Sequence, residues 1–286
     1  MGLSQKCMIV DLQLSRWSGT KIDPKASKQL VIEANTKDGS AIVSKRLVPK
    51  EAFTDIVTAC NALRAHMAKH TLPWSDNGQR IMTRNIFEIF MSGYGELERQ
   101  FNAAVAEFID VRYPQARDQA SFRMGDLFVE ADYPSIEELQ KKFQVTLDID
   151  GITEPDDFRV ALPQQELDKL KTSMEESIQR RLGSAMSDVW LRIADLLEHY
   201  IQKIGDPESI FRDSTVTNLV ELMNILPGLN ITGDPKLREI RQRIMGTIGS
   251  YQPNDLRKQD TLRAAAAQEA KEIRKEMQGF INGDRP

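Results

Sequence analysis

Residues 164–204 read QQELDKLKTSMEESIQRRLGSAMSDVWLRIADLLEHYIQKI, and their apolar side chains recur every three or four positions. That spacing is typical of one face of an α-helix, and Gly205-Asp206-Pro207 follows where a helix would end. At 1.5 Å per residue, such a helix would be roughly 60 Å long. It would exceed the thickness of a small domain, so we expect it to pack against other long elements or a partner.

Shorter helical patterns follow the long one. Residues 210–226 and 236–248 are predicted helices; Pro227-Gly228 ends the first, and Asp234-Pro235 begins the second. We expect both helices to run antiparallel to the long helix and to pack along it. Residues 249–255 have the composition of a linker. The remaining tail, from Leu262 to Phe280, has high helix propensity and a narrow apolar stripe, so it is either a docking helix or a partly formed tail.

The N-terminal residues favour strands. Residues 8–14 alternate between apolar and polar side chains, and 29–34 and 41–48 are two further strand candidates joined through the tight-turn pair Asp38-Gly39. A small antiparallel sheet is the natural interpretation. Residues 25–34 have a short helix as their alternative.

Pro49 marks a change to helical spacing. Residues 50–69 and 95–112 are predicted helices that pair as an antiparallel hairpin, with Pro114 ending the second. Ser135 and Glu138 have the spacing of a capping box at the start of a short helix. Residues 142–150 then alternate strictly and predict a strand that turns at Asp150-Gly151.

These patterns predict an α+β fold that is mainly α. It would combine a small N-terminal antiparallel sheet, a helical hairpin and a long-helix bundle with a helical C-terminal tail. The expected regions are 1–48 (small β region), 49–126 (helical hairpin), 127–163 (strand-containing connector), 164–250 (long-helix bundle) and 251–286 (basic helical tail).

Composition excludes several classes of protein. The chain has 286 residues, 42 acidic and 38 basic side chains, three His and two Cys. Two distant cysteines exclude a disulfide scaffold and a Cys-based zinc site. No apolar run is long enough for a membrane span or for the core of a signal peptide. We therefore expect a soluble protein of a reducing cytoplasm, with no cofactor and no membrane partner.

Sequence motifs for catalysis are weak. His66 and His70 have the spacing of two zinc ligands on a helix, but Met67 stands where a hydrolase would need Glu; ordinary surface histidines are the alternative. The acidic residues around the strand end suit either Mg²⁺ or Ca²⁺ or simply a solvated turn. They are Asp148, Asp150, Glu154, Asp156 and Asp157. Phosphate-loop and nucleophile-elbow motifs are missing, so we expect no metal site and no enzymatic activity.

Charge is unevenly distributed along the chain. Residues 236–275 carry ten basic and five acidic side chains, a net charge of +5, which leaves 28 basic and 37 acidic side chains, or −9, elsewhere. This region either contacts phosphates or an acidic protein surface, or closes salt bridges to the acidic body. Its candidate contact residues are Arg238, Arg241, Arg243, Arg257 and Lys258.

One compact motif lies near the N-terminus. Residues 10–19 read VDLQLSRWSG, in which Ser15, Trp17, Ser18 and Gly19 are the distinctive positions. Trp17 lies beside a turn, where it either covers the end of the small sheet or has a binding role. With the hairpin, the strand near 143–149 and the long helix, this motif resembles a family of uncharacterised proteins from phages and conjugative plasmids.

The resemblance implies which genes lie nearby, and it implies nothing about a catalysed reaction. Proteins of that family are often encoded near a MoxR-type AAA+ ATPase and a von Willebrand A-type protein, and they bring no catalytic residues to carry over. We expect a non-enzymatic phage or mobile-element protein of the host cytoplasm that acts as an assembly partner or adaptor of an AAA+ ATPase. The alternatives are a nucleic-acid-associated protein using the basic C-terminal region, and a virion or other structural oligomer built by self-association.

Overall fold

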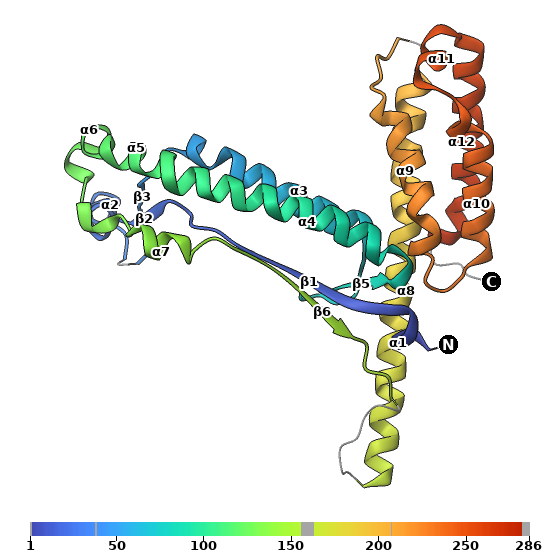
Figure 1. The fold of residues 1–286 in the computed structure, drawn as a ribbon, viewed down its shortest axis with the longest axis horizontal. Coiled ribbons are helices and arrows are strands. Elements are labelled where there is room, and N and C mark those ends of the chain that lie inside the picture. Colours follow the sequence, from blue (N-terminus) through green and yellow to red (C-terminus); the bar gives the residue numbers. More distant parts are fainter. Residues whose placement is uncertain (1, 38, 156–162, 207, 282–286) are drawn as a thin grey trace. The chain divides into compact units, whose positions relative to one another are not determined.

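The computed structural model describes residues 2–37, 39–155, 163–206 and 208–281. It confirms a mainly helical α+β fold with a small antiparallel sheet (Figure 1). The chain forms two compact units. Unit 1 comprises residues 1–11, 67–91 and 148–286, and unit 2 comprises residues 12–66 and 92–147. The five consecutive regions expected from the sequence therefore do not correspond to these units, each of which is assembled from separate segments.

Four elements contain the boundaries between the units. They are the strands β1 (Cys7–Ser15) and β6 (Gln144–Gly151) and the helices α3 (Thr54–His70) and α4 (Arg84–Glu107). The predicted hairpin region 49–126 thus contributes residues to both units.

The main sheet has the strand order β4-β5-β1-β6. The alternating patterns at 8–14 and 142–150 correctly predicted β1 and β6. The other two strands, β4 (Leu72–Pro73) and β5 (Arg80–Thr83), were not predicted because each is too short to show a period. The antiparallel register places Met8 opposite Met82 and Leu72 opposite Ile81.

Unit 1 is built on the helix α8 (Gln164–Ile204), which has the predicted bounds. Its buried side chains all lie in the C-terminal half, from Ala185 to Ile204. The remaining helices of this unit are α1 (Leu3–Lys6), α9 (Ser214–Leu229), α10 (Pro235–Gly246), the 3₁₀ turn η6 (Ile248–Ser250), α11 (Pro253–Lys258) and α12 (Asp260–Ile281). Helices α9 and α12 both pack on α8 (Figure 1).

The observed end of helix α9 differs from the end predicted at Pro227-Gly228. Pro227 lies inside the helix, which ends at Leu229, instead of stopping it. An ideal Cβ on Gly228 would lie only 2.3 Å from Ile86 Cγ1, and the Gly228 carbonyl accepts the Thr83 hydroxyl at 2.7 Å. Packing against these two residues offsets the hydrogen bond that Pro227 cannot donate.

Helix α12 belongs to the core of unit 1, as the docking-helix alternative for the C-terminal tail predicted. Its buried residues form a stripe of Ala266, Ala267, Ala270, Ile273 and Met277. The small alanine side chains let the helix approach α8 closely. Near the end of α12, Phe280 stacks on Trp190 of α8 at 5.0 Å between ring centroids.

Unit 2 contains a helix where the sequence favoured a strand. Residues 29–33 belong to α2 (Pro24–Glu33), so the predicted strand at 29–34 is wrong and its helical alternative is correct. The Asp23 carboxylate accepts the N–H groups of Lys25 and Ala26, and Pro24 occupies the first turn, which together start a helix. The predicted strand 41–48 shortens to β3 (Ser44–Arg46), which pairs with β2 (Thr20–Ile22). The expected turn at Asp38-Gly39 includes Asp38, outside the described residues.

The predicted antiparallel hairpin is present in unit 2. Arg112 pairs with Asp55 at one end, and the His66 ring packs against the Gly93 backbone at the other. Helix α4 begins at Arg84, eleven residues before the predicted start. It continues through five residues of π-helix, η2 (Phe108–Arg112), into α5 (Tyr113–Asp118), where Pro114 begins a helical turn instead of ending the helix.

The remaining elements of unit 2 are short. They are η1 (Lys50–Phe53), α6 (Ala120–Met124), η3 (Gly125–Leu127), η4 (Glu130–Asp132) and α7 (Ile136–Gln140). The predicted capping box is present at the start of α7, where Ser135 and Glu138 bond each other's backbone N–H groups.

Candidate functional site

The basic C-terminal residues predicted as contacts divide into two groups. Arg243 of α10 pairs with two glutamates of α12, Glu269 at 2.7 Å and Glu276 at 2.8 Å. Arg241 donates to the Met223 carbonyl at 2.7 Å, and Arg257 pairs with Asp213. These three arginines therefore join helices of unit 1.

Arg238 and Lys258 form the second group, because both are exposed and neither forms an ion pair among the described residues. These two cations, which are unpaired within the described part of the chain, lie on separate helices and offer a phosphate backbone only two contacts. Contacts within unit 1 thus occupy three of the five predicted contact residues, and two of these three form salt bridges.

Arg263 is a buried cation that sequence analysis missed. It is 8% exposed, and its guanidinium donates to the carbonyls of Lys203, Ile204, Asp206 and Ser209. These carbonyls lie at and just beyond the end of α8, where a helix leaves its last acceptors unsatisfied. An arginine in an apolar helical stripe was the available signal, since long cations are rarely buried without partners.

The predicted metal-ligand candidates do not form a cluster. No group of three or more His, Cys, Asp or Glu suited to a metal is found among the described residues. His70 is buried edge-on against Phe90, whereas His66 packs on Gly93. Of the acidic residues, Glu154 accepts the Ser4 backbone N–H at 2.7 Å, and Asp156 and Asp157 lie outside the described residues.

Both cysteines are free and buried. Burial raises the pKa of Cys7 to about 11, against a smaller opposing effect of Lys6, and it also raises the pKa of Cys60. A reactive thiol is normally partly exposed with a lowered pKa, so neither side chain has the environment of a nucleophile. Every helix among the described residues is either too short or too polar to span a lipid bilayer.

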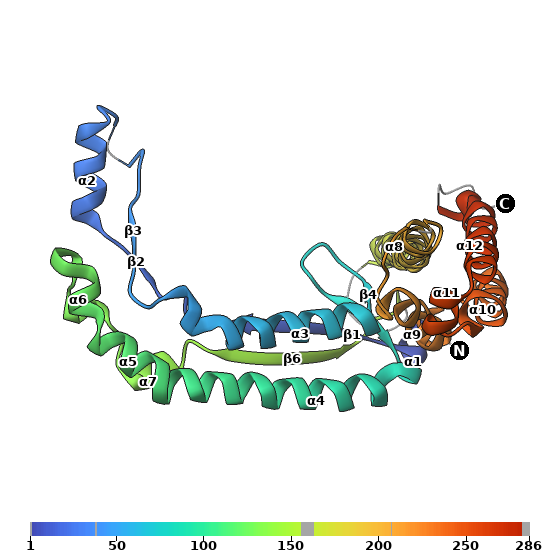
Figure 2. The same cartoon turned by 90° about the horizontal axis from the view of Figure 1, so that it is seen from above.

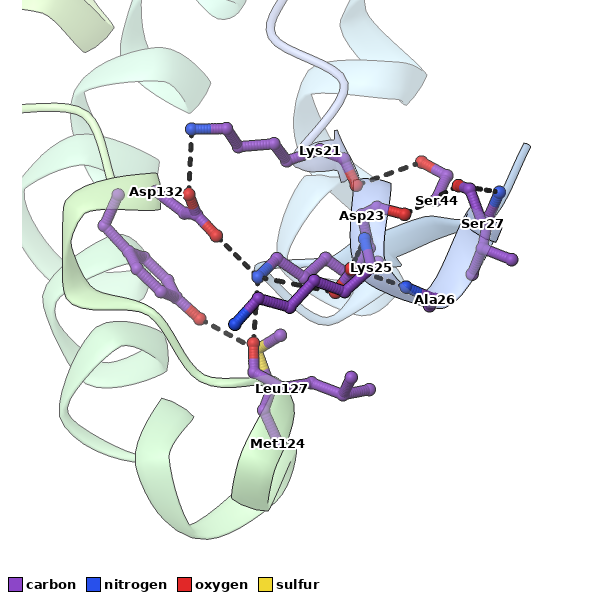
Figure 3. Close-up of polar contacts among 12 residues, drawn as sticks. Lys21, Asp23, Lys25, Ala26, Ser27, Ser44, Met124, Leu127 and Asp132 are labelled. Atoms are coloured by element: carbon purple, nitrogen blue, oxygen red, sulfur yellow. Dashed lines mark hydrogen bonds and ion pairs between the residues drawn. The ribbon is translucent and has the colours of Figure 1, made fainter. Parts of the chain in front are cut away.

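A buried ion-pair network joins two separate segments of unit 2. Lys45 of β3 contacts Asp132 at 2.6 Å and Asp23 at 3.8 Å, and it donates to the Leu127 carbonyl at 2.9 Å. Lys21 of β2 reaches the same Asp132 carboxylate at 2.8 Å. Figure 3 shows the Asp132 carboxylate beside the amine of Lys21 on the β2–β3 ribbon, with a dashed line marking their ion pair.

The two lysines of this network determine the ionisation of the Asp132 carboxyl group. Burial, the largest effect, raises the pKa of the carboxyl group, but the hydrogen bonds and charges of Lys21 and Lys45 together hold it below its ordinary value. Asp132 is therefore a fixed anion at neutral pH, and the network serves to attach the β2–β3 ribbon to the segment 124–133.

The segments joined by this network carry most of the exposed large apolar side chains of unit 2. Phe122 on α6 is 96% exposed, Ile32 on α2 is 78% exposed and Ile42 before β3 is 68% exposed. Figures 1 and 2 show α2, β2, β3 and α6 gathered at the same end of unit 2. We call this group of side chains the apolar end: Ile22, Ile32, Ile42, Phe122, Leu127 and Val129.

Sequence periodicity did not reveal the apolar end, because α2 and α6 are too short for a hydrophobic face to be recognised. Single exposed apolar side chains are common on protein surfaces, whereas several gathered at one place mark interaction sites. The apolar end is therefore a candidate interaction surface of unit 2.

No family model, curated protein or solved structure matches the chain.

Proposed function

We propose that this chain is a non-enzymatic assembly partner that binds another protein through the apolar end of unit 2. The exposure of Phe122, Ile32 and Ile42 carries the proposal. Removing such side chains from water on binding is favourable by roughly 1.5–3 kcal/mol each. Aromatic and aliphatic anchors of this size commonly supply the hot spots of an interface.

The rigidity of the surface supports the same proposal. The β2–β3 ribbon is held to the segment 124–133 by the Lys45–Asp132 pair, and the Tyr133 hydroxyl donates to the Leu47 carbonyl at 3.0 Å. The apolar side chains are thus presented on elements that are fixed relative to one another within unit 2. A preorganised surface loses less conformational entropy when a partner binds.

The resemblance to the phage and plasmid family supplies a candidate partner, an AAA+ ATPase of the MoxR type. The experiment is co-purification of the full chain with such an ATPase from the same source. We expect a complex that the double variant Phe122→Ser/Ile32→Ser weakens at least tenfold. The control Ile210→Ser/Ile89→Ser removes two exposed apolar side chains from unit 1 and leaves the complex intact.

Light scattering of the chain alone distinguishes the alternatives. Large assemblies that disappear in the Phe122→Ser/Ile32→Ser variant identify a structural oligomer instead of an adaptor. Equal binding of the ATPase by both double variants, or no binding at all, overturns the proposal.

A further inference from the structure

The motif at residues 15–19 forms a turn that joins three segments of unit 2. Gly19 has φ +65°, and its carbonyl accepts the Leu47 N–H at 2.8 Å, which holds the turn beside the end of β3. An ideal Cβ on Gly19 would lie 2.7 Å from the ring of Phe53. The motif thus needs glycine here, and the turn brings Arg16 and Trp17 close to η1 and β3.

A cavity of about 660 Å³ lies at this turn. Its walls come from the turn, the end of β3, η1 and the first turns of α3. Its cationic lining residues are Arg16, Arg46 and Lys50, and the single carboxylate among the lining residues is Glu51. None of these three cations forms an ion pair within the described part of the chain.

A second cavity of about 570 Å³ shares Trp17 as a wall. It adds Lys141 and Lys142, which also have no ion pair among the described residues, besides the Lys21–Asp132 pair and Glu138. Together the two cavities are lined by six cationic and three anionic side chains. The lining of the two cavities therefore has a net charge of +3, although the whole chain has a net charge of −4. Such a positively charged surface attracts anionic ligands.

Trp17 supplies an aromatic wall between the cations. It is partly exposed, and its indole is held edge-on by Tyr113 at 5.6 Å and by Phe53 at 6.1 Å between ring centroids. Proteins that bind single strands combine a positively charged groove with aromatic side chains on which bases stack. Cations on both sides of one indole suit an extended polyanion better than a single phosphate group.

From this arrangement we infer that the two cavities flanking Trp17 form a binding site for a short single-stranded nucleic acid. The phosphates lie against Arg16, Arg46 and Lys50 in one cavity and against Lys141 and Lys142 in the other. A base packs against the indole of Trp17. This site is separate from the basic C-terminal region, where most of the predicted contact arginines are already paired within unit 1.

The test measures the fluorescence anisotropy of a labelled dT12 oligonucleotide with the full chain at several salt concentrations. We expect the variant Arg16→Ser/Arg46→Ser/Lys50→Ser to lose at least tenfold in affinity. For this variant, the slope of log K against log salt concentration should become less negative by about 2. Each lost phosphate contact on a single strand changes that slope by about 0.7. Trp17→Phe should abolish quenching of tryptophan fluorescence on binding, with circular dichroism confirming the fold.

The matched control removes the same charge from the C-terminal region as Arg238→Ser/Lys258→Ser/Lys275→Ser, and it should bind dT12 as the parent does. Loss of binding in this control instead of the Trp17-site variant overturns the inference. So does the absence of binding to dT12 at 20 mM salt, a condition of about 20 Å Debye length. Equal competition by a mononucleotide or by a 12-residue polyglutamate would also overturn it, because neither offers both an extended phosphate backbone and bases.

Discussion

The Arg263 guanidinium donates through Nε to the carbonyl of Ile204 at 2.9 Å, and its Nη2 group reaches the carbonyls of Lys203 and Ser209. One side chain of α12 therefore closes the C-terminal end of α8. This contact explains how the final helix of the chain belongs to the core of unit 1, besides the apolar stripe that it buries.

Arg263→Lys should lower the free energy of unfolding by about 2–3 kcal/mol. A lysine is a point charge with a single nitrogen and cannot match the planar fork of an arginine, so buried carbonyls lose their donors. Urea denaturation of both chains measures the difference. Arg238→Lys, at an exposed position of α10, is the control and should change stability by less than about 0.5 kcal/mol.

Asp132→Asn should cost about 3 kcal/mol at pH 7, because it leaves the buried Lys45 ammonium with a weaker partner. The lowered pKa of Asp132 also predicts how this cost depends on pH. The carboxylate stabilises the folded chain above the ordinary aspartate pKa of about 3.9. Its contribution is lost as the pH falls through the lower folded-state value.

Urea titrations of both chains at pH 7 and in steps below pH 4 measure this dependence. The stability difference between parent and variant should shrink across the acidic range. Asp126→Asn removes an exposed carboxylate from the neighbouring η3 turn and serves as the control. A difference between parent and Asp132→Asn that stays constant with pH would contradict the assigned role of Asp132.

Tyr200→Phe should raise the free energy of unfolding by about 1 kcal/mol. The Tyr200 hydroxyl is fully buried in α8 and has no hydrogen-bond partner in the described structure, so its removal relieves an unsatisfied polar group. Tyr113→Phe is the opposite case, because the Tyr113 hydroxyl donates to the Pro134 carbonyl at 2.6 Å. Thermal unfolding should show a higher midpoint for the first variant and a lower one for the second.

Gly228→Ala should destabilise the chain by about 1–3 kcal/mol, since the new methyl group would overlap the side chain of Ile86 in a closely packed site. Gly95→Ala, in the middle of α4, places a methyl group where the described residues have no atom within 4 Å beyond its chain neighbours and the helix's own backbone. It should therefore be neutral or stabilising by up to about 1 kcal/mol. Equal effects of the two substitutions on the urea midpoint would argue against the close packing of α9.

Cys7 should react very slowly with a thiol reagent in the folded chain. With a pKa of about 11, roughly one thiol in a thousand is ionised at pH 8, and the sulfur is buried as well. The reaction rate of the single-cysteine variant Cys60→Ala should rise about tenfold per pH unit between pH 7 and 10. Rapid reaction at pH 7 without denaturant would contradict the buried position of Cys7.

Local patterns were sufficient for α8, for β6 and for two capped helix starts, whereas they missed the first eleven residues of α4. The period of residues 164–204 predicted α8 with its observed ends, because 41 residues provide many repeats of one apolar face. Asp234 and the pair Ser135–Glu138 marked two helix starts, since a cap acts within one helical turn. The strict alternation near Phe143 predicted β6.

Tertiary packing decided the features for which sequence and local chemistry leave alternatives. Pro227 stays inside α9 because Gly228 packs on Ile86, a residue 142 positions away in the chain. Arg243 and Arg257 are paired within unit 1, which their clustering in sequence did not reveal, because partners from other helices are set only by folding. The two cavities beside Trp17 likewise exist only once β1, β3, η1 and α7 are brought together.

The charge distribution shows most clearly what sequence determines and what only folding decides. The sequence by itself determined that residues 236–275 are basic and that the rest of the chain is acidic. Only the tertiary structure decided which cations form no ion pair among the described residues, such as Arg16, Arg46 and Lys50. The physical reason is that an ion pair acts over a few ångströms in space, whatever the separation of its members along the chain.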